Sequence, residues 1–131
     1  MAKLILKSIE GEFGASLMDM DLSEGGFFVN IECEIGEQGK NGSEVFSFNI
    51  CDEKGLLRTI WQDSEFKEKQ ITNLSGYNVF VMKTYDLESL LRYIDGILSS
   101  IPENIPWKQK GLLLSRYFYW DNFSETIEKL A

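Results

Sequence analysis

The strongest constraint on the fold is a pair of alternating segments on either side of a glycine-rich turn. Apolar side chains occupy every second position in residues 27–35, and residues 44–51 repeat the pattern. Such alternation is typical of strands that bury one face. The intervening segment, GEQGKNG, contains Asn41-Gly42, and Asn-Gly is the strongest short-range signal for a hairpin. The sequence therefore predicts an antiparallel β-hairpin.

The same alternation predicts which hairpin side chains face the core. The inward set is Phe27, Val29, Ile31, Cys33, Ile35, Phe46, Phe48 and Ile50, and the outward set is Phe28, Asn30, Glu32, Glu34, Val45, Ser47, Asn49 and Cys51. Because Cys33 and Cys51 fall on opposite faces, we expect two free thiols. Glu32 and Glu34 are predicted side by side in solvent, with Glu37 following at the turn.

The rest of the chain predicts an α+β fold in a single domain over residues 1–131. Strands are expected at 3–9 and 77–83, a long loop at 10–25, a short helix at 52–61, a helix that begins after Asp86 and is ended by Pro102, and a helix at 107–117. The strands come mostly first and the helices mostly later. We therefore expect a mostly antiparallel four-stranded sheet, with the short helix and two C-terminal helices packed on one face.

Negative charge is concentrated in the first part of the chain. The net charge is −8, and residues 8–53 contain eleven acidic residues and one basic residue, a local charge of −10. A field of one sign favours the steering of a basic partner, although an acidic surface also occurs simply for solubility. Nucleic acid and anionic membranes are not expected to bind directly. The N-terminus has no signal-peptide pattern, so a cytoplasmic location is expected.

No catalytic, cofactor or metal signature is evident. The chain has no histidine, and Lys40 is followed by Asn41 and a strand where a phosphate-binding loop needs Ser or Thr and a helix. Asp19, Asp21 and Glu24 do not satisfy the EF-hand pattern but leave a weak cation site open. Glu32 and Glu34 also have the chemistry of an acid–base pair, but such a pair is usual on a solvated strand. We expect no enzyme activity and no cofactor.

The aromatic segment Tyr117-Phe118-Tyr119-Trp120 has two interpretations. It either packs into the core from a C-terminal helix, which the sequence favours, or supplies a binding anchor, because Tyr and Trp are enriched at interface hot spots. Tyr119 and Trp120 are therefore retained as candidate partner-binding residues.

Three segments together resemble the immunity protein 8 family of bacterial polymorphic toxin and contact-dependent inhibition systems. They are IECEIGEQGKNGSEVFSFNICDEKGLL, YNVFVMKTYDLESLLRYI and PWKQKGLLLSRYFYWDNF, and the resemblance extends over roughly residues 3–125. The matching positions are core aromatics, a turn and a helix cap, with no catalytic residues among them.

The resemblance implies a protein that binds and neutralises a cognate toxin domain, often a nuclease or another basic enzyme. The acidic block suits that role, because an acidic face speeds association with a basic partner. The candidate contacts are Glu32, Glu34, Glu37, Asp19, Asp21, Glu24, Tyr119 and Trp120. Two alternatives remain: an acidic mimic of nucleic acid that binds a host DNA- or RNA-binding protein, and a metal-assisted hydrolase that uses the Asp19–Glu24 loop. The sequence leaves the oligomeric state open.

Overall fold

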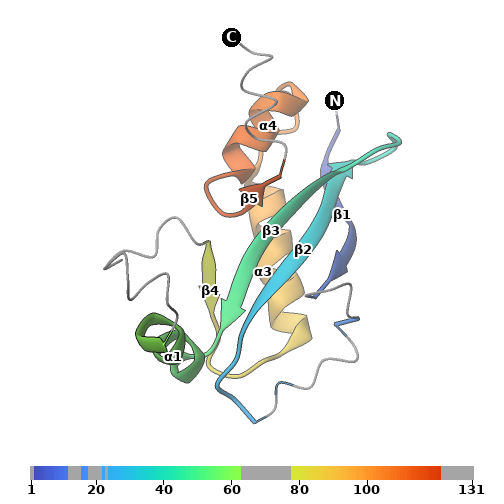
Figure 1. Ribbon diagram of the computed structural model, residues 1–131. Coiled ribbons are helices and arrows are strands. Elements are labelled where there is room, and N and C mark those ends of the chain that lie inside the picture. The colour runs from blue at the N-terminus through green and yellow to red at the C-terminus, as the bar shows by residue number, and fades with distance from the viewer. Residues whose placement is uncertain (1, 12–15, 18–21, 23, 63–77, 122–131) are drawn as a thin grey trace.

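In the part of the chain that the structure describes, the fold is α+β, with a mostly antiparallel sheet and three helices, as the sequence predicts (Figure 1). The computed structural model describes residues 2–11, 16–17, 22, 24–62 and 78–121. In these residues the elements are β1 (Leu4–Glu10), β2 (Phe28–Glu37), β3 (Glu44–Cys51), α1 (Glu53–Gln62), β4 (Val79–Val81), α3 (Leu87–Ser100), α4 (Trp107–Leu114) and β5 (Tyr119–Trp120).

The predicted hairpin is confirmed and forms the centre of the sheet. β2 and β3 pair antiparallel from Phe28 opposite Cys51 to Ile35 opposite Glu44. Gly39 and Gly42 in the turn have φ angles of 80° and 95°, a region that favours glycine. The predicted inward residues are all buried except Val29, which is partly buried. The glycines of this segment therefore serve the turn.

The sheet contains one strand more than the sequence predicts. Its order is β1-β2-β3-β4, and β5 also pairs with β3. β4 runs parallel to β3 along residues 49–51, whereas β5 runs antiparallel to it at Phe46 and Ser47. Two short strands thus share one edge of β3, and β1 forms the opposite side of the sheet (Figure 1).

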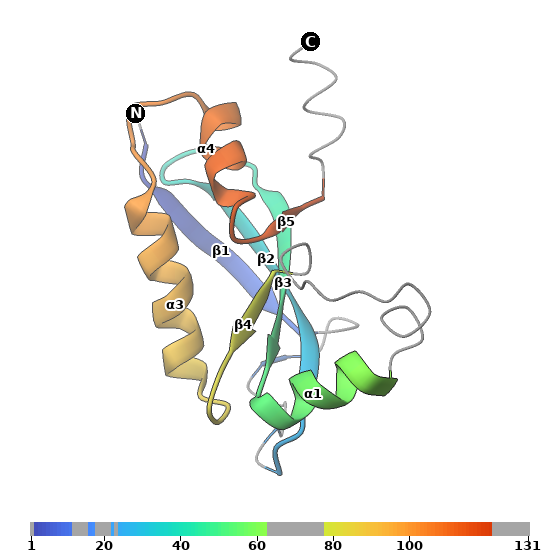
Figure 2. The same cartoon turned by 90° about the vertical axis from the view of Figure 1, so that its left-hand side faces the viewer.

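The predicted helix after Asp86 is confirmed and supports the core. The Asp86 side chain accepts a hydrogen bond from the backbone N–H of Glu88, which is the usual N-cap contact. Leu90, Ile94 and Leu98 are buried on one side of α3. Figure 2 shows α3 running alongside the sheet, with α4 and α1 at opposite ends of the molecule.

Two residues of the aromatic tail, Phe118 and Trp120, pack into the core, and Trp120 does so from a strand. α4 ends at Leu114, so the helix predicted over 107–117 is shorter, and the chain then turns back to β3. Phe118 and Trp120 are buried, and the Trp120 ring stacks on Phe46 with centroids 5.6 Å apart. Gly111 of α4 lies against the same indole, because a Cβ there would come within 2.4 Å of it.

The predicted short helix is confirmed, and Asp52 organises its start. Its carboxylate accepts hydrogen bonds from the N–H groups of Gly55 and Gly26, at 2.7 and 2.6 Å. Burial alone would raise the pKa of Asp52, but these backbone donors hold the pKa below its usual value. α1 approaches β2 closely, because a Cβ at Gly55 would lie 1.8 Å from the Phe27 carbonyl oxygen.

The alternation assigns Cys51 to the outward face, opposite to Cys33, but its side chain is fully buried. It lies between Phe28 of β2 and Val81 of β4, and α1 contacts this end of β3. The two cysteines are free thiols, as predicted.

Candidate partner-binding surface

Three carboxylates share the sheet surface that points away from the buried side chains. Glu32 and Glu34 are exposed on β2, as the alternation predicts. Glu10 of β1 lies directly opposite Glu32, and Ser8 lies opposite Glu34. A β-bulge between Leu6 and Ser8 sets this register. We call Glu10, Glu32 and Glu34 the acidic face.

The acidic face places two like charges in direct opposition. Directly opposite side chains of an antiparallel pair lie about 4.5–5.5 Å apart at Cβ, and like charges at that separation destabilise the sheet. Glu10 and Glu32 form such a pair. Their arrangement therefore weakens the fold slightly while it concentrates negative potential on one surface.

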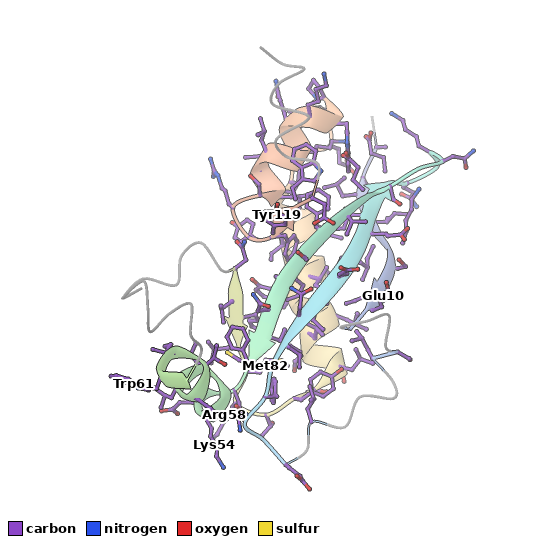
Figure 3. All side chains as sticks on the ribbon, in the orientation of Figure 1. Glu10, Lys54, Arg58, Trp61, Met82 and Tyr119 are labelled. Carbon is purple, nitrogen blue, oxygen red and sulfur yellow. The ribbon has the colours of Figure 1, made fainter. Side chains whose placement is uncertain are left out.

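An exposed tyrosine lies in the same row of side chains. Glu32 is opposite Ser47 on β3, and Ser47 is opposite Tyr119 on β5. Tyr119 is 59% exposed. With neighbouring strands about 4.8 Å apart, the row from Glu10 to Tyr119 extends for about 14 Å. Figure 3 shows Glu10 and Tyr119 on either side of the hairpin strands.

Glu37, which the sequence predicts at the turn beside the exposed carboxylates, is mostly buried at the end of β2, and its role as a partner contact stays a prediction. Its side chain is only 12% exposed, and it accepts a hydrogen bond of 2.8 Å from Nζ of Lys110. The Lys110 side chain is 1% exposed and also donates to the carbonyl of Ala2, at 2.6 Å. The hydrogen bond from Lys110 holds the pKa of Glu37 below its usual value, against the opposing effect of desolvation. Glu37 therefore joins the hairpin to α4.

Of the remaining candidate contacts, Trp120 is buried, Glu24 is exposed, and two aspartates lie outside the described residues. Trp120 is 1% exposed, so its side chain is part of the core rather than the surface. Glu24 is exposed, ahead of β2. Asp19 and Asp21 lie outside the described residues, so the contact and the weak cation site predicted around them stay predictions.

The sequence did not lead us to predict the inward positions of Glu37 and Lys110 or the exposure of Trp61. The first two positions nevertheless left a signal in the sequence. Glu37 has the same strand parity as Ile35, which already indicates an inward side chain. Lys110 lies three residues after Trp107 and four before Leu114, on the inward stripe of α4. Trp61 is 75% exposed at the end of α1, and Figure 3 shows it projecting from the molecule.

Burial makes the two cysteine thiols of the core poor nucleophiles. Desolvation raises the pKa of Cys33 to about 12, and desolvation together with the charge of Asp52 raises the pKa of Cys51 to about 11. Both thiols are therefore protonated at neutral pH. No group of three or more acidic or cysteine side chains in the described part of the chain is arranged to hold a metal ion. Within those same residues, no helix has the length and apolar character to cross a membrane.

Comparison with known proteins identifies one family. The family model described as Immunity protein 8 matches residues 6–124 of the chain. The match includes both strands of the hairpin, the acidic face, α3, α4 and the aromatic tail. No curated protein and no solved structure matches the chain.

Proposed function

Because the chain belongs to the immunity protein 8 family, we propose that it binds and neutralises a cognate bacterial toxin domain through the acidic face. The protein acts by forming a protein–protein complex in the cytoplasm and not by catalysis. The observation that carries this proposal is the row of exposed carboxylates on β1 and β2 with Tyr119 at its end.

Charge indicates the class of toxin. Enzymes that act on nucleic acid need a basic surface to bind the phosphate backbone. The acidic face is complementary in charge to such an enzyme, because residues 8–53, which contain it, have a local charge of −10. We therefore propose that the toxin domain is a nuclease or another basic enzyme. Fast, charge-steered association is useful when an incoming toxin must be captured before it acts.

The experiment is co-expression with the toxin domain encoded beside this gene. Cells that produce the toxin domain alone are expected to stop growing, and cells that also produce this protein are expected to grow. The control is a toxin domain from an unrelated system, which this protein should not neutralise. Failure to restore growth, with both proteins detected in the cells, would refute the proposal. Binding to a host DNA- or RNA-binding protein without rescue would instead favour an acidic mimic of nucleic acid.

A further inference from the structure

A small cavity lies between the tip of the hairpin and the first turn of α4. Its volume is about 220 Å³, and Glu37, Lys40, Glu44 and Trp107 supply the larger side chains of its wall. We call it the tip pocket. Pockets for drug-sized ligands usually measure about 300–1,000 Å³. The tip pocket is therefore the right size for a single side chain or a small ion.

The charges around the tip pocket include one that can be replaced. Lys110 is buried and held by both Glu37 and the Ala2 carbonyl, so its ammonium group is fixed. Lys40, by contrast, is 62% exposed and approaches Glu37 only to 3.5 Å. Exposed ion pairs of this type stabilise a protein very little. A stronger cation can therefore displace Lys40 at small cost.

Trp107 provides a flat wall that is held in place. Its indole N–H donates a hydrogen bond of 2.5 Å to Oε2 of Glu44, and the side chain is half-buried. This contact fixes both the ring and the carboxylate at the rim of the pocket. A tryptophan face attracts cations more strongly than the other aromatic side chains do, and more so when water is excluded.

We propose that the tip pocket receives an arginine side chain of the toxin domain, whose guanidinium takes the place of Lys40 beside Glu37 and Glu44 and lies on Trp107. The inference rests on the proposed function and adds a specific anchor to it. The guanidinium brings the same single positive charge that Lys40 withdraws, so the exchange leaves the net charge around the pocket unchanged. Its planar fork of donors suits two carboxylates better than a lysine ammonium does.

The chemistry of the tip argues against an anion in the same place. The carbonyl oxygens of Lys40 and Gly42 both accept hydrogen bonds from Nζ of Lys7, at 2.6 and 2.7 Å. These two backbone carbonyls at the tip therefore already bind a cation, the ammonium group of Lys7. The carboxylates of Glu37 and Glu44 line the pocket itself. An anion would meet carboxylates there, whereas a guanidinium would meet acceptors.

Two substitutions test the pocket through the dissociation rate of the toxin complex. Glu44→Gln keeps an acceptor oxygen for the Trp107 N–H but removes the charge, and it should speed dissociation about tenfold, because buried charged contacts act mainly on that rate. Lys40→Met removes the internal competitor and should slow dissociation about threefold. The matched controls are Glu103→Gln for Glu44→Gln and Lys108→Met for Lys40→Met, because they remove the same kind of charge at exposed positions outside the pocket. Both controls should leave the dissociation rate unchanged.

A second measurement uses the free protein and ethylguanidinium chloride. Nuclear magnetic resonance should show a saturating shift of the Trp107 indole N–H signal, assigned by its loss in Trp107→Phe, and a weaker shift in Glu44→Gln. Equal dissociation rates for Glu44→Gln and Glu103→Gln would overturn the inference while leaving toxin binding intact. If the toxin domain does not bind at all, the proposed function fails, and a non-saturating guanidinium titration then overturns the pocket as well.

Discussion

Replacing Lys110 by methionine is expected to lower the free energy of unfolding by about 3–5 kcal/mol, because it leaves the mostly buried Glu37 carboxylate with only the 3.5 Å contact of the exposed Lys40. Glu37 would keep its nearly buried position but lose its hydrogen bond of 2.8 Å. Urea denaturation followed by circular dichroism measures the change. Methionine preserves most of the apolar stem, so the loss reports chiefly on the ammonium group.

The double variant Lys110→Met with Glu37→Leu separates the ion pair from packing. Replacement of a whole buried pair by apolar residues is often neutral or stabilising. We therefore expect the double variant to recover most of the stability that Lys110→Met loses. A double variant as unstable as the single one would show that Lys110 supports the fold by its shape or by its contact with Ala2, rather than by pairing with Glu37.

The stability difference between wild type and Lys110→Met is also expected to depend on pH. The folded-state pKa of Glu37 is lowered, chiefly by the hydrogen bond from Lys110. Its contribution is therefore complete above the usual glutamate pKa of about 4.3 and is lost as the pH falls through the lowered value. The difference should be constant near neutrality and shrink in acid. A difference that is unchanged in acid would contradict the assignment.

The second large effect is expected on toxin capture. Neutralisation of the acidic face by Glu10→Gln, Glu32→Gln and Glu34→Gln together should reduce the association rate with a basic toxin domain about 10- to 100-fold at low salt. The dissociation rate should change less. The same variant should be as stable as wild type or slightly more so, because the opposed Glu10 and Glu32 no longer repel each other.

A matched variant controls for net charge. Glu88, Asp95 and Glu103 are exposed on α3 and on the segment that follows it, away from the acidic face. Their replacement by Gln, Asn and Gln changes the total charge by the same amount. Stopped-flow kinetics at several salt concentrations compare the two variants. Equal association rates for both would mean that the acidic face has no special part in steering.

Local pattern was sufficient to predict the hairpin and α3. In residues 27–51 the alternation of apolar side chains and the Asn-Gly turn point to the same structure, so the pairing follows from the chain itself. For α3, the Asp86 cap and the spacing of Leu90, Ile94 and Leu98 agree in the same way.

Tertiary contacts decided the features that the sequence did not predict. β5 consists of two residues and exists because Trp120 fits against Gly111 of the preceding helix and against Phe46, which lies far away in the sequence. Cys51 is buried because β4 and α1 meet at the end of β3, and neither position can be inferred from strand parity. Within the candidate site, parity placed Glu32 and Glu34 correctly. It also indicated that Glu37 faces inward, but the negative charge of the segment outweighed that signal in the prediction.

The proposed function requires that this protein binds a toxin domain directly and with high affinity. Isothermal titration calorimetry with the purified toxin domain encoded beside the gene, inactivated in its own active site, measures this most directly. We expect a saturable complex of nanomolar or tighter affinity, weakened by the three acidic-face substitutions and by added salt. The absence of binding at micromolar concentrations, with both proteins folded, would contradict it.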